Sequence, residues 1–203
     1  MKTMNKAVQD QITPADALNR LVEGNNRFTQ NTQVQRDLQE QIVDTSQGQY
    51  PFAAVLSCID SRVPAEIVFD QGIGDVFSAR VAGNIVNEDM LGSIEYACKV
   101  AGSKLVVVMG HTKCGAVTAA CKNVELGNIT ALLSKIKPAV EKCRKGVEMD
   151  SEAIEEVAIQ NVLLSIENIR KESPILAEME KEAQIKIIGA IYNVASGEVA
   201  FLN

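Results

Sequence analysis

The chain has 203 residues, of which 46% are hydrophobic, and this is enough to bury the core of one domain. Its formal net charge is −6 and it contains no tryptophan, so binding to a nucleic-acid backbone or to an anionic membrane surface is disfavoured. The N-terminal region lacks the continuous apolar run of a secretory signal, and five cysteines are an odd number that suits a reducing compartment. We therefore expect a cytoplasmic protein with one domain, residues 1–203.

The first predicted element is an amphipathic helix over residues 14–28. Thr13 is a good N-cap residue, and Pro14 is well tolerated at the first helical position. We expect this helix to end near residues 24–26, where Gly24 begins a polar stretch. Residues 31–50 are polar, and favour a loop with one further helix around 37–43. Residues 1–50 are thus predicted to form an N-terminal helical arm ahead of a core, residues 51–203.

From residue 52 onward, short apolar runs are separated by helical stretches. Strands are predicted at 52–56, 76–81, 104–109 and 185–191. Helices are predicted at 64–69, 88–100, 114–123, 129–144, 153–171 and 175–181. Strands that alternate with helices favour parallel pairing in a sheet that helices cover on both faces. A turn at Gly197 then leads to an antiparallel edge strand over 199–202. The predicted fold is α/β: a single domain with a central, mostly parallel sheet flanked by helices.

Two of the predicted strands end in residues that bind metals. Cys58 follows the first strand and His111 follows the third, and ligands of open parallel sheets gather at the carboxyl ends of the strands. Cys114 would open the next helix, whose N-terminus favours a thiolate. Two cysteines and one histidine leave one tetrahedral position open, as in catalytic zinc sites. The sequence therefore predicts one Zn²⁺ per chain, held by Cys58, His111 and Cys114.

No fourth cysteine or histidine is placed to close this site. His111 is the only histidine, and the three other cysteines, at 98, 121 and 143, fall within predicted helices. Asp60 is placed to occupy the open position, while Arg62 could compete for its carboxylate through a bidentate pair. Taken singly, a buried cysteine is more often structural, and Asp60 with Arg62 could be a surface ion pair. The joint spacing of these residues favours the metal site.

The segments 58–62 and 111–115 resemble the two metal motifs of the β-class carbonic anhydrases. The segments 13–28, 80–84 and 92–96 are also similar to bacterial members of that family, so the resemblance spans most of the chain. It implies an enzyme that interconverts carbon dioxide and bicarbonate through a zinc-bound hydroxide, with Asp60 and Arg62 orienting the bound water. It also implies a homodimer or homotetramer in which the N-terminal helices embrace the neighbouring subunit.

The resemblance further suggests that Gln71 lies in the substrate pocket, and that Arg80 either binds bicarbonate or fixes the dimer interface. Val55 stands where members regulated by bicarbonate carry tryptophan, so that regulatory pocket is expected to be absent. Ser173 stands where other members place a tyrosine beside the substrate pocket. Two alternatives stay open: a zinc hydrolase of the same fold that acts on carbonyl sulfide or carbon disulfide, and a non-catalytic zinc-binding relative.

Overall fold

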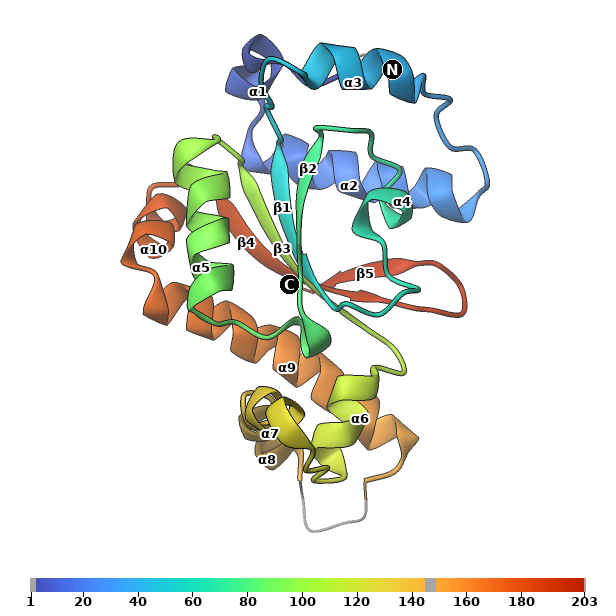
Figure 1. Ribbon diagram of the computed structural model, residues 1–203, viewed down its shortest axis with the longest axis vertical. Helices are drawn as coiled ribbons and strands as arrows, with labels where there is room; N and C mark the ends of the chain where they lie inside the picture. Colours follow the sequence, from blue (N-terminus) through green and yellow to red (C-terminus); the bar gives the residue numbers. More distant parts are fainter. Residues whose placement is uncertain (1–2, 145–148, 203) are drawn as a thin grey trace.

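A five-stranded sheet forms the centre of the protein (Figure 1). The computed structural model describes residues 3–144 and 149–202. The strands lie in the order β2-β1-β3-β4-β5, and their bounds are β1 Ala53–Ser57, β2 Val76–Arg80, β3 Leu105–His111, β4 Lys186–Tyr192 and β5 Val199–Leu202. The first four pair in parallel, whereas β5 pairs with β4 in antiparallel fashion. The predicted fold class, with its antiparallel edge strand, is confirmed.

The helices lie around this sheet and beyond its ends. Their bounds are α1 Lys6–Gln11, α2 Pro14–Thr29, α3 Leu38–Thr45, α4 Ala65–Val68, α5 Glu88–Glu95, α6 Gly115–Cys121, α7 Gly127–Ser134, α8 Lys137–Cys143, α9 Ser151–Glu172 and α10 Pro174–Lys181, with a 3₁₀ turn at Ala82–Asn84 and a π turn at Tyr96–Val100. None of the helices in the described part of the chain is long and apolar enough to cross a membrane. Figure 1 shows α6, α7 and α8 in a lobe beyond the carboxyl end of β3.

The sheet buries a different hydrophobic cluster on each face. Successive side chains of a strand point to opposite faces. Val107 accordingly packs in the cluster that contains Leu21 of α2, while Val106 and Val108 pack in the cluster that contains Val162 of α9. Every residue of β1 and β3 is buried, which explains why both strands read as unbroken apolar runs in the sequence.

Helix α2 begins as predicted but ends later than predicted. The Thr13 hydroxyl accepts a hydrogen bond from the Asp16 N–H, and the Asp16 carboxylate accepts one from the Thr13 N–H, which completes a capping box. The expected end at residues 24–26 is wrong, because the helix continues to Thr29. Gly24 serves close packing instead: a Cβ atom there would lie 1.8 Å from the carbonyl oxygen of Phe69.

Two other predicted elements are subdivided, and one was missed. The stretch 129–144 forms two helices, α7 and α8, and Pro138 stands in the first turn of α8, where its missing N–H does no harm. The stretch 88–100 changes from α-helix to a π turn at Tyr96. Helix α1 was not predicted; it is short and is capped by the Asn5 side chain.

A buried ion-pair network ties the segment after α2 to the end of α4. The Asp70 carboxylate, whose side chain is 3% exposed, pairs with Arg27 and Arg36 and accepts a hydrogen bond from the Val34 N–H. Burial raises the pKa of Asp70, but the hydrogen bonds from both guanidinium groups outweigh it and the pKa is lowered. The network stabilises the polar loop that connects α2 to α3, which contains Val34 and Arg36.

Candidate metal centre

The structure brings Cys58, His111 and Cys114 together in one buried group. The two Sγ atoms and a ring nitrogen of the histidine all lie within 4.8 Å of one another. Cys58 follows β1 directly, His111 is the last residue of β3, and Cys114 is the N-cap residue of α6. Strands β1 and β3 are parallel neighbours, with Ser57 opposite Met109, so their carboxyl ends meet at the same edge. The geometry that the sequence predicted for these three side chains is thus present.

The histidine presents a nitrogen that suits a metal ion. His111 Nδ1 lies 2.9 Å from the carbonyl oxygen of Thr112. A carbonyl only accepts hydrogen bonds, so Nδ1 carries a proton, and Nε2 has a free lone pair when the ring is neutral. Nε2 is buried and has no hydrogen-bond partner among the described residues. Such an atom is costly in a protein interior, and a bound metal ion would satisfy it.

The two thiols share hydrogen bonds that favour one thiolate. A hydrogen bond from Cys114 lowers the pKa of Cys58 to about 4 against the opposing effect of burial. The Gly83 N–H also donates to Cys58 Sγ, over 3.3 Å. The same pairing, together with burial, raises the pKa of Cys114. A metal ion must displace the remaining thiol proton, as is usual for cysteine ligands. Two sulfurs and one imidazole nitrogen are donors that fit zinc.

Asp60 lies against this group and is held there by Arg62. Arg62 donates from Nε to Oδ1 over 2.9 Å and from Nη2 to Oδ2 over 2.8 Å, and its backbone N–H also donates to Oδ1. Oδ2 of Asp60 is 3.9 Å from His111 Nε2. The hydrogen bonds from Arg62 hold the pKa of the Asp60 carboxyl well below its ordinary value. The carboxylate is therefore ionised and oriented beside the three ligand side chains.

Arg80 supports the backbone that carries two of these residues. From the last position of β2 it donates Nε to the carbonyl oxygen of Cys58 over 3.0 Å and Nη2 to that of Asp60 over 2.6 Å. These bonds fix the loop between Cys58 and Asp60. Binding of bicarbonate and a place in a dimer interface, the two roles expected for Arg80, stay predictions.

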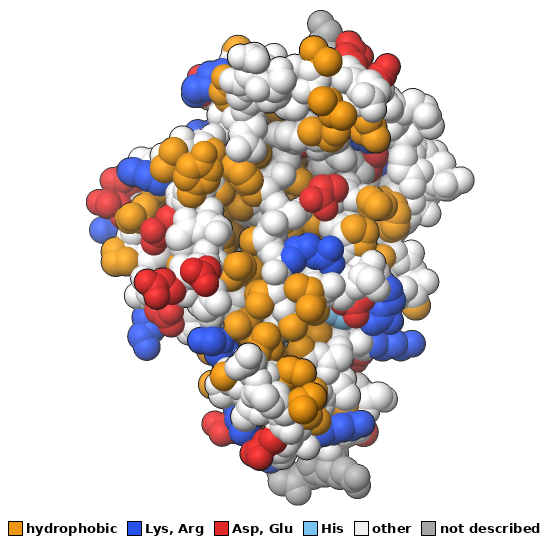
Figure 2. Space-filling model, in the orientation of Figure 1, with side chains coloured by type: hydrophobic (Ala, Val, Ile, Leu, Met, Phe, Trp, Pro, Cys, Tyr) orange, Lys and Arg blue, Asp and Glu red, His pale blue; other side chains and the backbone are white. Residues whose placement is uncertain are grey.

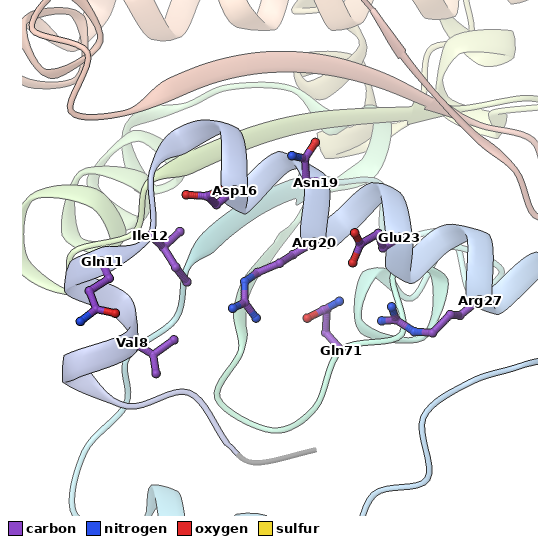
Figure 3. A pocket seen from close by; sticks show the side chains of 9 residues that line it. All are labelled: Val8, Gln11, Ile12, Asp16, Asn19, Arg20, Glu23, Arg27 and Gln71. Carbon is purple, nitrogen blue, oxygen red and sulfur yellow. The ribbon is translucent and has the colours of Figure 1, made fainter.

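Gln71 lies elsewhere in the chain. It lines a pocket of about 580 Å³ with residues of α1 and α2, and none of the described lining residues belongs to the Cys58, His111 and Cys114 group. Figure 3 shows Gln71 facing Arg20 and Arg27 of α2 across this pocket. Its side-chain amide donates to the carbonyl oxygen of Phe69. Within one chain Gln71 is thus not brought to the metal ligands, and its substrate-binding role stays a prediction.

Val55 and Ser173, the two positions where the chain differs from other members of the family that it resembles, both contact neighbouring parts of the fold. Val55 is fully buried in β1 and packs in the cluster of Leu21. Ser173 caps α10 by accepting from the Leu176 N–H, and its hydroxyl donates to Glu95. Both side chains therefore contribute to packing or capping.

Several contacts around the site were not foreseen from the sequence. The Lys113 N–H, between two metal-ligand candidates, donates to the Glu155 carboxylate of α9 over 2.7 Å. Lys113 has a positive φ of 54°, so this bond holds a loop conformation that few residues adopt. Asn161 and Ser165, also on α9, donate to the carbonyl oxygens of Gly83 and Asn84. In the sequence, Asn161 and Ser165 stand out only as polar residues on an otherwise apolar face of the helix.

The chain is similar to known carbonic anhydrases over most of its length. The family model described as carbonic anhydrase matches residues 53–199. The carbonic anhydrase of Mycolicibacterium smegmatis is 33% identical, with 92% of each chain covered, and carbonic anhydrase 2 of Mycobacterium tuberculosis is 33% identical, with 91% of this chain and 90% of that protein covered. The crystal structure of the β-carbonic anhydrase CafA of Aspergillus fumigatus superposes with a TM-score of 0.74 at 27% identity, covering 93% of this chain and 90% of that one. The chain therefore belongs to the β-class carbonic anhydrases, a family of enzymes.

Proposed function

We propose that the protein catalyses the reversible hydration of carbon dioxide to bicarbonate and a proton, with one Zn²⁺ held by Cys58, His111 and Cys114. The observation that carries the proposal is the convergence of two buried sulfurs with the buried Nε2 of His111, which has no hydrogen-bond partner among the described residues. When bound, zinc would lower the pKa of a water molecule and so supply hydroxide as the nucleophile. Three protein ligands leave a fourth position for that water, as catalytic sites require.

Asp60 is proposed to orient the nucleophile. An ionised carboxylate only accepts hydrogen bonds, so it fixes the direction of an O–H group placed beside it. Arg62 occupies both oxygens of Asp60 with side-chain N–H groups, which restrains the carboxylate from turning onto the metal. Arg80 is proposed to act indirectly: its hydrogen bonds to the carbonyl oxygens of Cys58 and Asp60 fix the backbone of both residues, and so the positions of their side chains.

The surroundings of the group suit a small apolar substrate. Cys58 and Cys114 belong to a hydrophobic cluster that includes Ile85 and Val117, with Val81 packed against it. Carbon dioxide has no net dipole and needs no polar partner to enter such surroundings. The proton released by hydration needs a different route. Because the only histidine is used as a ligand, we propose that water, buffer or a carboxylate accepts this proton.

We also propose that the protein works as a homo-oligomer with a dimer as its smallest unit, in the cytoplasm. Strand β2 is an edge of the sheet, and edge strands are usually covered. Large apolar side chains near this edge are exposed, among them Ile67 at 60% and Tyr96 at 51%. Figure 2 shows hydrophobic side chains gathered on the face where β2 and α5 lie. A second copy of the chain would cover them.

Stopped-flow measurement of carbon dioxide hydration by the zinc-loaded protein tests the proposed reaction. We expect one zinc per chain and rapid hydration. The same preparation should be assayed with carbonyl sulfide and carbon disulfide, the substrates of the alternative zinc hydrolase. Hydrolysis of either without hydration of carbon dioxide would favour the zinc hydrolase. One zinc per chain with neither activity would favour the non-catalytic relative, and light scattering reports the oligomeric state.

A further inference from the structure

We propose that Asn161 of α9 is a positioning residue for the metal site, because it holds the turn at Gly83 whose N–H donates to the Cys58 sulfur. The inference rests on the proposed metal site. It concerns a chain of two hydrogen bonds, from the Asn161 amide to the Gly83 carbonyl oxygen over 2.7 Å, and from the Gly83 N–H to Cys58 Sγ over 3.3 Å.

The turn that carries Gly83 is built for this contact. Gly83 has a φ of 69°, in the left-handed region that glycine adopts without steric cost. There is also no room for a side chain, since a Cβ atom would lie 2.6 Å from Cδ1 of Ile136 and 3.3 Å from Cβ of Ala116. The backbone N–H is therefore brought to the sulfur by a conformation that glycine adopts more readily than other residues. This turn requires support, because the next residue, Asn84, also has a positive φ of 43°.

Helix α9 supplies that support from one face. Asn161 and Ser165 are four residues apart, so they lie on the same side of the helix. Both are almost fully buried, at 1% and 3% exposure, and they donate to the adjacent carbonyl oxygens of Gly83 and Asn84. Because a carbonyl only accepts, the amide nitrogen of Asn161 must be the atom that faces Gly83.

The position of α9 is itself fixed by close packing on the sheet. A Cβ atom on Gly110 of β3 would lie 2.8 Å from Cγ2 of Val162, the residue that follows Asn161. Glycine at this point lets the helix approach the strand that ends in His111. The packing of α9 on β3, the strand that carries His111, thus fixes where the Asn161 side chain lies. The hydrogen bond from Asn161 then fixes the turn at Gly83.

The hydrogen bond from Gly83 changes the donor properties of the sulfur. An N–H group that points at a thiolate withdraws negative charge from it, so the thiolate gives less charge to a bound metal ion. Groups that hydrogen-bond to metal ligands typically change metal affinity or activity by about 10–100-fold when removed. Asn161 acts on this bond through the Gly83 carbonyl oxygen.

The cobalt(II)-substituted protein provides a direct readout, because thiolate-to-cobalt charge-transfer absorption reports the charge on sulfur. Asn161→Leu keeps the approximate volume but removes the donor. We expect its charge-transfer band to move to lower energy, because the sulfur without the N–H contact gives more negative charge to the metal ion. Ser165→Ala is the matched control: it removes a buried hydrogen bond from the same helix face to the neighbouring carbonyl, and should move the band much less.

A band that does not move in folded Asn161→Leu, or that moves equally in Ser165→Ala, would overturn the inference. If Asn161→Leu does not fold, the wild-type protein loaded with ¹¹³Cd decides the matter by NMR. A scalar coupling between the Gly83 amide proton and ¹¹³Cd, passed through the Cys58 sulfur, supports the inference, and its absence contradicts it. If wild-type protein shows no thiolate-to-cobalt band at all, the proposed metal site itself fails, which is a distinguishable result.

Discussion

Replacement of Asp60 or Arg62 separates the orientation of the nucleophile from the binding of the metal. Neither residue belongs to the buried group of two sulfurs and one nitrogen, so Asp60→Ala and Arg62→Ala should each retain one zinc per chain. The pair is partly exposed, with the Asp60 side chain at 18% and that of Arg62 at 49%. An ion pair that is open to solvent contributes little to stability, so Tm should fall by no more than about 2–4 °C.

The expected loss of activity is much larger than the loss of stability. Removing one oriented hydrogen-bonding group from an active site typically costs about 10²–10³ in kcat, or roughly 2.7–4 kcal/mol. We expect a loss of this size for Asp60→Ala, because Oδ2 lies 3.9 Å from the lone-pair nitrogen of His111. Arg62→Ala should lose less. Without Arg62 the pKa of Asp60 rises toward its ordinary value of about 3.9, so the carboxylate stays ionised at neutral pH but is no longer held.

Stopped-flow hydration of carbon dioxide, with zinc content measured on the same samples, checks this order. Arg62→Lys is a useful third variant, since it keeps the charge but cannot form the bidentate pair. Asp10→Ala is a control, because it removes an exposed carboxylate paired with Lys6 on α1. Wild-type turnover in zinc-loaded Asp60→Ala would refute the assigned role. Loss of zinc from that variant would instead make Asp60 a required ligand.

Further predictions concern the ligands, the acid stability and the pH profile. Cys114→Ser should lose zinc by elemental analysis while Cys98→Ser retains it, and equal zinc contents would contradict the ligand assignment. Asp70→Asn should lower the free energy of unfolding by about 3–5 kcal/mol in urea titrations at neutral pH, because it breaks a buried ion pair, whereas Asp10→Asn should change it by less than about 1 kcal/mol. The pKa of Asp70 is lowered in the folded protein, so the stabilisation from Asp70 is present above about pH 3.9 and is lost as pH falls through the folded pKa. In Asp70→Asn, the free energy of unfolding should therefore decrease less as the pH is lowered through this range. Because two thiolates would cancel the formal charge of Zn²⁺, kcat/KM should rise from neutral pH to an alkaline plateau, and a profile already maximal at pH 6.5 would argue against this. Because the single histidine is proposed as a ligand, kcat should also depend on buffer concentration.

The sequence by itself was sufficient to predict the sheet and the set of candidate ligands. Strands β1 and β3 are buried on both faces, so their residues form apolar runs that are visible locally, and each run ends at a ligand candidate. Parallel neighbours place their carboxyl ends at one edge, which brings Cys58 and His111 together without further information. The start of α2 was equally readable, because a capping box is a contact between residues three apart.

Contacts between distant parts of the chain required the tertiary structure. Gly24 was read as the end of a helix because its packing against the Phe69 carbonyl has no local signature. Gln71 was expected in the substrate pocket by resemblance; within one chain it lies beside α2, and its role stays a prediction. Asn161 is 78 residues away from Gly83, and only the packing of α9 on the sheet brings the two together. A hydrogen bond of that range depends on how whole elements pack, and neither periodicity nor spacing along the chain records it.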